Sequence, residues 1–219
     1  MTTFATMQAR IADETLRDDL ASQIRQSINS AIQTWEGQRF AFNETRWTIN
    51  TVAGTEYYTM ASPTLLTSAG AAVATGELVL ELDDIVAVVD SMPYRLCPRT
   101  QQYVNEWQDD SFQSQPDSYT IYGDQLRIFP TPDDAYELRL NGLARLGPNP
   151  LSSDNDTNGW MTDGEALIRH QAKFLLYRDV IRDKDGMALA SEGIKEAEWS
   201  LKRKMSAKVM IGHQVHRSL

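Results

Sequence analysis

Cysteine is almost absent from this chain of 219 residues, because Cys97 is the only one. One cysteine cannot form a disulfide within the chain, which is typical of proteins that assemble in a reducing compartment. Long apolar runs are also missing. Met1–Glu14 has no apolar core or small-residue cleavage site, and the uncharged stretch Tyr57–Gly76 is rich in Thr, Ser, Ala, Gly and Pro. We therefore expect neither a signal peptide nor a membrane span.

The chain as a whole has no excess of basic residues. It contains 30 acidic and 21 basic residues, a net charge of −9, which argues against a module that grips nucleic acid. The segment Leu201–Leu219 is the exception: it has no acidic residue and five basic ones, namely Lys202, Arg203, Lys204, Lys208 and Arg217. The rest of the chain therefore carries −14, and this asymmetry suggests a basic C-terminal segment that meets a partner.

Catalytic motifs are missing too. The sequence has no phosphate-binding glycine loop and no serine in a nucleophile elbow. Its three histidines lie in a predicted helix or near the C-terminus, as His170, His213 and His216. Adjacent carboxylates occur in three pairs, at Asp83-Asp84, Asp109-Asp110 and Asp133-Asp134. Neighbouring carboxylates in a turn point apart, so we expect no catalytic residue, although a hydrolase that uses Asp and Glu stays as an alternative.

Helical periodicity marks the start of the chain. Phe4, Met7 and Ile11 predict a short helix over Thr3–Asp13. A second helix is expected to be capped by Asp18 or Asp19, to run to Glu36 and to stop at Gly37. Its apolar stripe consists of Leu20, Ile24, Ile28, Ile32 and Trp35. This stripe predicts a face that packs into a core.

Helical periodicity returns near the C-terminus. Thr162–Arg182 is apolar nearly all round, which predicts a central helix. After a turn at Asp183–Gly186, Met187–Met205 is expected as the last helix, with one apolar stripe. The six apolar residues of the central helix are Leu167, Ile168, Phe174, Leu175, Tyr177 and Ile181, and those of the last are Met187, Ala190, Ile194, Ala197, Leu201 and Met205.

Alternation of apolar and polar residues predicts strands between these helices. The expected pairs are a hairpin of Thr45–Thr51 with Glu56–Met60, and Ile85–Val89 with Pro93–Leu96, next to a separate strand at Glu77–Leu82. A three-stranded antiparallel sheet is expected from Tyr119–Tyr122, Gln125–Phe129 and Tyr136–Leu143, with a turn at Gly123-Asp124. Leu126 and Ile128 are expected on one face of the second strand, and Tyr136, Leu138 and Leu140 on the buried face of the third. Thr100–Trp107 is expected as a short helix capped by Thr100, and Ala61–Gly76 as an exposed loop that contacts a neighbouring molecule.

The sequence therefore predicts an α+β fold. We expect residues 1–44 and 160–205 to form one helical bundle, with residues 45–146 as an inserted antiparallel β-rich domain. Gly147–Gly159 is rich in Pro, Gly, Ser, Asn and Asp and is expected to be a linker. Residues 206–219 lack helical periodicity and are expected to form a tail.

One segment matches a calcium-binding loop. Asp154, Asp156, Asn158 and Glu165 occupy ligand positions one, three, five and twelve of that pattern, and Gly159 permits its sharp turn. Two prolines precede the loop in place of a helix, and Thr162 with Glu165 forms a capping box, which would hold Glu165 without any ion. We assign no metal and no cofactor, and a calcium-dependent binding module stays as a second alternative.

Three segments in order resemble the head-to-tail adaptor (connector) proteins of tailed phages, of the tail tubular protein A type. The first is the aromatic run Trp35–Glu44. The second is the Gln115–Leu140 region, which includes Tyr122-Gly123-Asp124 and Phe129-Pro130-Thr131-Pro132-Asp133. The third is Asp154–Asn158, which leads into Thr162–Ile168. The resemblance spans nearly the whole chain and departs at Ala61–Gly76, which is longer than the family's connection there.

This resemblance implies a structural virion protein and not an enzyme. Family members form a homo-oligomeric ring, commonly of twelve copies, below the portal protein in the virion neck, after assembly in the host cytoplasm. The ring extends the DNA channel and carries the tail or nozzle protein, with no membrane contact. DNA is expected to pass without specific binding, since an acidic body repels phosphates.

The resemblance also implies that the C-terminal segment docks on the portal. We expect Ser206–Leu219 to be disordered in the free protein and to become ordered on docking. The expected docking residues are the basic side chains and apolar anchors of this region: Lys202, Arg203, Lys204, Lys208, Val209, Met210, Ile211, Val215, Arg217 and Leu219.

Overall fold

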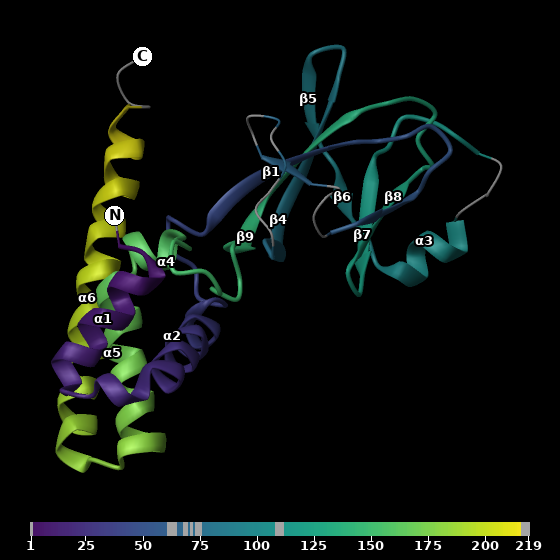
Figure 1. Ribbon diagram of the computed structural model, residues 1–219. Coiled ribbons are helices and arrows are strands. Elements are labelled where there is room, and N and C mark those ends of the chain that lie inside the picture. Colours follow the sequence, from purple (N-terminus) through teal and green to yellow (C-terminus); the bar gives the residue numbers. More distant parts are fainter. Residues whose placement is uncertain are drawn as a thin grey trace. The chain divides into compact units, whose positions relative to one another are not determined.

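The computed structural model describes residues 2–60, 65–67, 70, 72, 76–107 and 112–215, without the side chains of Trp107 and residues 206–215. The described part has an α+β fold, as predicted, with six α-helices and mostly antiparallel strands (Figure 1). The chain divides into two compact units. We call Met1–Asn43 with Pro148–Leu219 the helical unit, and Glu44–Gly147 the β unit.

The helical unit is built on three packed helices, since α5 packs against both α2 and α6, while α1 packs on α2 and α5. The α-helices are α1 (Phe4–Thr15), α2 (Ala21–Trp35), α4 (Gly159–Thr162), α5 (Glu165–Leu176) and α6 (Lys184–Val215). The predicted stripe of α2 is buried throughout, from Leu20 to Trp35. The Trp35 indole donates a hydrogen bond to Gln171 Oε1 of α5 at 3.3 Å, so the buried stripe of α2 faces α5.

The start of α2 differs from the prediction. Asp18 and Asp19 do not cap it, because they lie in a short 3-10 helix, η1 (Asp18–Leu20), and Leu20 stands at the cap position without a side-chain hydrogen bond. The carboxylate of Asp19 accepts a hydrogen bond from Arg17 Nε at 2.7 Å instead. In contrast, Thr3 caps α1 and exchanges hydrogen bonds with Thr6, which explains why that helix begins where the sequence indicated.

The predicted helix Thr162–Arg182 begins later than expected. Glu165–Ile181 is helical without a break, as α5 followed by a π-helical turn, η2 (Tyr177–Ile181), while Thr162 ends the separate helix α4. The capping box does not form, since the Thr162 hydroxyl donates back to the carbonyl oxygen of Asn158 at 3.3 Å and Gly164 precedes α5. A threonine hydroxyl can donate a hydrogen bond to a nearby backbone carbonyl as readily as it can accept one from an amide. Here a carbonyl in the turn of α4 accepts that hydrogen bond.

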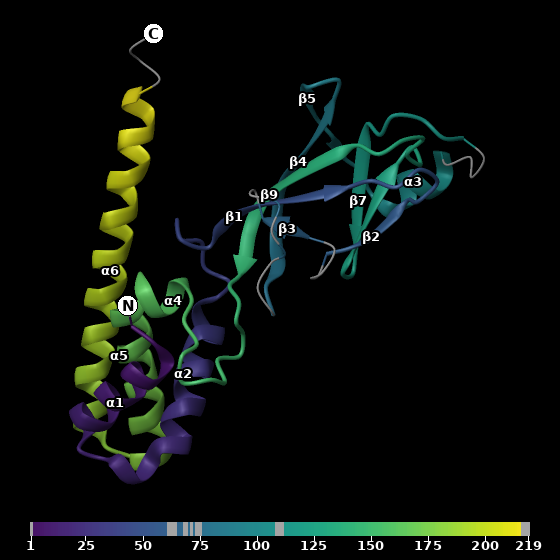
Figure 2. The ribbon, with the colours of Figure 1, turned by 45° about the horizontal axis from the view of Figure 1, so that its top comes forward.

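The last helix is longer than predicted. The backbone of α6 continues ten residues beyond Met205 and ends at Val215, so the expectation of a non-helical tail is wrong for residues 206–215. Its final turns extend past the other helices of the helical unit (Figures 1 and 2). His216, Arg217, Ser218 and Leu219 lie outside the described residues. In the part of the chain that the structure describes, no helix combines the length and apolarity needed to cross a bilayer.

The β unit contains two sheets. One has the strand order β3-β1-β9-β4-β5, and the other has the order β2-β8-β7-β6. Only the short β6–β7 pair is parallel among these strands. The strands are β1 (Glu44–Asn50), β2 (Tyr57–Thr59), β3 (Leu66–Thr67), β4 (Leu78–Val89), β5 (Met92–Arg95), β6 (Cys97–Pro98), β7 (Ser118–Tyr122), β8 (Gln125–Phe129) and β9 (Glu137–Arg145), with helix α3 (Gln101–Trp107) after β6.

The inward faces of both sheets supply one apolar core. Trp47, Leu126, Ile128, Leu138 and Leu140 are all at most 1% exposed. Leu126 with Ile128, and Leu138 with Leu140, are the alternating residues that the sequence placed on one face. The prediction of their burial is therefore confirmed, as is the cap of α3, where Thr100 Oγ1 accepts from the amide of Tyr103 at 3.2 Å.

Strand pairing differs from the prediction in three places. β7 and β8 form the expected hairpin, but β9 joins the other sheet, between β1 and β4. β2 pairs with β8 and not with β1. The two predicted strands Glu77–Leu82 and Ile85–Val89 are one strand, β4, whose pairing with β9 contains two register shifts. In addition, only alternate residues of Ile85–Val89 are fully buried, so that run is not covered on both faces.

The two crossings between the sheets run beside each other. The amide of Thr51, after β1, donates to the carbonyl of Tyr136 at 2.9 Å, and the amide of Gly54 donates to Pro132 at 2.8 Å. The connection from β1 to β2 and the connection from β8 to β9 are thus tied together. This explains why neither forms the tight hairpin that the sequence suggested.

Candidate functional site

The aromatic run of the first resemblance segment has a structural role. Asn43 is fully buried; its Oδ1 accepts from the amide of Phe40 at 2.7 Å and its Nδ2 donates to the carbonyl of Gln38 at 2.8 Å. Phe40 and Phe42 both pack edge-on against Trp160 of α4, with centroids 5.6 and 4.9 Å away. The motif therefore fixes the chain where α2 ends and ties it to α4, and its buried groups are closed to a ligand.

The segment predicted as a linker is bound to the helical unit. The carbonyls of Asp154 and Asp156 accept from the first amides of α1, those of Ala5 at 3.1 Å and Phe4 at 2.9 Å. Asn29 of α2 bonds both the amide and the carbonyl of Leu151. These contacts satisfy helix-end amides that would otherwise lack a partner, so the segment completes the helical unit.

The four oxygen ligands of the calcium pattern are each engaged elsewhere in the protein. Asp154 pairs with Arg25 at 3.1 Å, and Glu165 pairs with Arg10 at 2.9 Å. Asp156 Oδ2 accepts from the amides of Ser152 and Ser153 at 2.7 and 2.8 Å, which lowers the pKa of that carboxyl. Asn158 Oδ1 caps α4. Among the residues whose side chains the structure describes, no three His, Cys, Asp or Glu side chains are arranged to hold a metal ion.

The described carboxylate pairs are each engaged locally. Asp84 accepts from Asn141 at 2.6 Å while its neighbour Asp83 is exposed, and Asp133 accepts from the Tyr136 hydroxyl at 2.6 Å. That hydrogen bond raises the pKa of Tyr136 to about 12. Asp109 and Asp110 lie outside the described residues. The arrangement of the described pairs gives no support to the alternative of an acid–base hydrolase.

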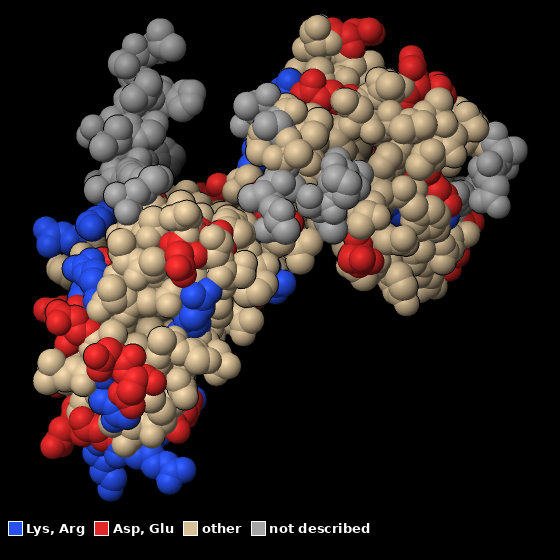
Figure 3. Space-filling view, in the orientation of Figure 1, with Lys and Arg blue, Asp and Glu red and all other residues tan. Residues whose placement is uncertain are grey.

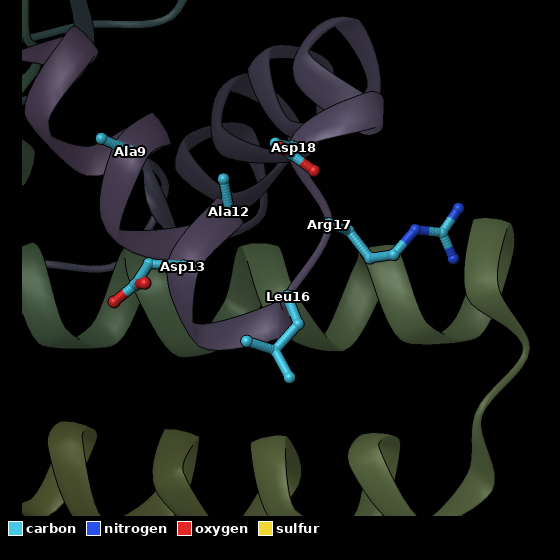
Figure 4. A pocket seen from close by; sticks show the side chains of 6 residues that line it. All are labelled: Ala9, Ala12, Asp13, Leu16, Arg17 and Asp18. Carbon is cyan, nitrogen blue, oxygen red and sulfur yellow. The ribbon is translucent and has the colours of Figure 1, made fainter.

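The hollow beside α1 has no converging chemistry either. It measures about 460 Å³ and is lined by Ala9, Ala12, Asp13, Leu16, Arg17 and Asp18. Figure 4 shows the carboxylates of Asp13 and Asp18 pointing away from one another. Leu16 is 86% exposed and has a left-handed backbone, with φ of 53°. This corner is a surface hollow of mixed polarity in which the two carboxylates do not converge.

His170 of α5 is half-buried against α6. Burial lowers its pKa, and the charges of Lys173 and Arg169 act in the same direction. α6 approaches closely here, since a Cβ added to Gly193 would lie 2.4 Å from His170 Nδ1. The histidine thus serves as a packing residue between the two helices.

Charge is divided unevenly between the two units. Residues 44–147 contain 15 acidic residues and six basic ones, all six arginine, so the β unit carries the whole net charge of −9. The remaining residues contain 15 acidic and 15 basic residues and are neutral. On the face shown in Figure 3, red and blue residues mix over the helical unit, while the β unit shows mainly red ones.

The most distinctive exposed surface of the helical unit lies on α6. We call it the docking face and define it by Trp199, Lys202, Arg203 and Lys204. All four side chains are exposed, with Trp199 at 63%. The Arg203 guanidinium lies 5.3 Å from the centroid of the Trp199 ring, and Lys202 pairs with Glu198 at 2.5 Å. Aromatic and Arg side chains are enriched at protein–protein interfaces.

The structure places the predicted docking residues in three groups. Lys202, Arg203 and Lys204 belong to the docking face. Lys208, Val209, Met210, Ile211 and Val215 lie on the helical backbone of α6, although their side chains are not described. Arg217 and Leu219 lie outside the described residues. The sequence prediction missed Trp199. This residue lies outside the apolar stripe that contains Leu201 and Met205, and that position could have indicated an exposed aromatic ring.

Two depressions adjoin α6 near this face. An open hollow of about 390 Å³ lies between α5 and α6, with Trp199 on its rim and Ala166, Gly193 and Ala197 among its lining. A groove of about 400 Å³ is lined by Ala41, Phe42, Thr162, Asp163, Leu201, Lys204 and Met205. The α6 segment therefore offers an exposed ring and two recesses of mixed polarity, which suits contact with a protein.

A comparison with known families agrees with these features. A family model described as SU10 adaptor protein matches residues 2–209. The chain belongs to this family of phage head-to-tail adaptors. Its resemblance to phage adaptors is thereby confirmed, and the match covers both units and α6 up to residue 209. No curated protein matched the chain.

Proposed function

We propose that this SU10 family adaptor is a structural component of the virion neck that binds below the portal, extends the DNA channel and attaches the tail or nozzle protein. The observation that carries the proposal is the family match over nearly the whole chain. The absence of converging acid–base or metal-binding side chains among the described residues is compatible with a structural role.

We further propose that the two units are domains with different tasks. In this proposal residues 1–44 and 160–205 form a helical bundle, and residues 45–146 form a β-rich insertion. The division of internal contacts into Met1–Asn43 with Pro148–Leu219, and Glu44–Gly147, supports it. The loop at residues 61–76 lies mostly outside the described residues, and its contact with a neighbour or the tail stays a prediction.

The charge division supports passage of DNA along a channel made by a ring of copies, commonly twelve. A surface with net charge −9 repels phosphates over a Debye length of about 8–10 Å at physiological salt. The β unit holds all of this charge and has no lysine, so it is the unit suited to line a channel without gripping DNA.

Docking on the portal is assigned to the C-terminal part of α6 and the residues after it. The sequence suggested a tail that folds on docking, but the backbone is helical to Val215. Ordering a disordered chain costs about 1–2 kcal/mol per residue in conformational entropy. A helix that has formed before binding therefore loses less entropy when it binds. Docking would then resemble the insertion of a helix into a groove.

Deletion of residues 206–219 tests this assignment. The truncated protein should keep its melting temperature, because all the core residues whose side chains are described lie before residue 206. It should no longer co-sediment with portal, and electron microscopy of the intact protein with portal should show a ring. A Lys195→Ala variant, with its exposed lysine on the same helix, is the control and should bind normally. Full portal binding by the truncated protein would refute the assignment.

A further inference from the structure

The docking face contains an aromatic side chain that is mostly exposed. Trp199 is 63% exposed, whereas Trp47 and Trp160 are fully buried and Trp35 is 8% exposed. Leu201 and Ala190 form the side of α6 that faces the core. Trp199 lies on the opposite side, so most of its apolar surface is not covered within the helical unit.

The indole is held in place although it is exposed. The Arg203 guanidinium, one helical turn later, covers the ring at 5.3 Å. Such a cation over an aromatic face restricts both side chains, because each loses contact if the other rotates. A side chain that is already ordered pays less entropy when a partner covers it.

The surroundings of the ring give its preferred partner a definite chemistry. Lys202 and Arg203, three and four residues after Trp199, are exposed on the same side of the helix, while Glu198 is engaged with Lys202. Trp199 also lines the hollow over Ala166, Gly193 and Ala197, whose lining includes the polar side chains of His170, Glu196 and Ser200. The complementary surface is therefore an apolar slot with carboxylates at its rim.

We propose that Trp199 is the anchor of portal docking, inserting with Arg203 into an apolar slot rimmed by acidic residues on the portal. This inference rests on the proposed function and names a side chain before residue 206 that acts together with residues 206–219 in the same docking. Trp and Arg are enriched among the few residues that dominate protein interfaces, and the cations beside them mainly raise the association rate and fix orientation.

The test measures portal binding of the full chain by biolayer interferometry. Trp199→Ala should weaken binding about thirtyfold or more, as expected for an anchor residue, and Trp199→Phe should recover most of the loss. The control is Leu189→Ala, which removes another apolar side chain of α6 that is 72% exposed and should change binding less than about twofold. Melting temperatures of all three variants should match the unaltered protein.

A second measurement reports on the ring itself. The difference in tryptophan fluorescence between the unaltered protein and Trp199→Phe reports the emission of this indole alone. The emission maximum of this difference spectrum should shift to shorter wavelength when portal is added, because the ring leaves water. Normal binding by Trp199→Ala, or an unshifted difference spectrum, overturns the anchor while leaving portal docking intact. No portal binding by the unaltered chain overturns the proposed docking and the anchor with it.

Discussion

Replacing Gly142 of β9 with alanine should destabilise the β unit strongly. Gly142 lies in the middle strand of a sheet, paired with Thr45 of β1 on one side and Leu82 of β4 on the other. An added Cβ would lie 2.1 Å from the carbonyl oxygen of Glu81 and 3.2 Å from the Cα of Leu82. Both are backbone atoms, so no side chain can rotate to make room.

The magnitude follows from opposing effects. Alanine in place of glycine within a strand gains about 0.5–1 kcal/mol by reducing the entropy lost on folding. Ordinary contact begins near 3.4 Å, so β4 and β9 must separate by more than about 1 Å at this point. Such overpacking costs about 1–3 kcal/mol, and each ladder hydrogen bond weakened adds about 0.5–1.5 kcal/mol. The net loss should be about 2–4 kcal/mol.

Amide hydrogen exchange followed by mass spectrometry measures this loss unit by unit. Protection of β4 and β9 should fall by tens to hundreds of fold, while α5 in the helical unit serves as an internal reference. The matched control is Gly37→Ala, because an added Cβ there meets nothing within 4 Å and should change protection little. Unchanged protection of β4 and β9 in Gly142→Ala would show that the close approach is not rigid.

Two further predictions concern the helical unit. Ile28→Ala should cost about 2–5 kcal/mol in urea unfolding, since Ile28 is fully buried on α2 against α5; a cost below about half a kilocalorie would exclude that packing. Burial holds the pKa of His170 below its ordinary 6.5, so the unfolded chain binds the proton more readily and stability should fall as pH drops below about 6.5. Melting temperatures from pH 8 to 5 should show this fall, and His170→Asn should reduce it; an equal fall in both proteins would assign it to other groups.

The loss of stability caused by protonation of His170 occurs at a different pH from the loss caused by protonation of Glu14. Burial tends to raise the pKa of Glu14, but its hydrogen bond to Lys173 and the charge of Arg169 outweigh burial and lower that pKa below its ordinary 4.5. The stabilisation from Glu14 is therefore complete above about pH 4.5 and is lost only at lower pH. The fall in stability between pH 6.5 and 5 therefore has no contribution from Glu14.

Helix positions and local turns followed from the sequence because they depend on near neighbours. The spacing of Phe4, Met7 and Ile11 located α1, and Gly123, with φ of 63°, made the turn between β7 and β8. The break between α4 and α5 was missed because the Thr162 and Glu165 pattern fits a capping box equally well. The helical backbone after Met205 was missed because residues 206–215 lack an apolar stripe, although a helix that projects from its unit requires none.

The docking face was predicted in part. The charges of Lys202, Arg203 and Lys204 were visible in the sequence, but Trp199 was not singled out. Only the tertiary structure shows which aromatic rings are buried in a core and which are exposed. In the same way, the calcium pattern matched a spacing rule. Only the tertiary structure showed that Asp154 forms an ion pair with Arg25 and Glu165 with Arg10.

The sequence by itself determined the α+β class, the apolar face of each main helix, the burial of alternating residues in β8 and β9, and the family to which the chain belongs. Only the tertiary structure decided that β9 lies between β1 and β4, that β2 pairs with β8, and that Gly142 must lack a side chain. The physical reason is that side-chain periodicity records which face of an element is buried. The neighbour that buries it is chosen by contacts between residues far apart in the chain.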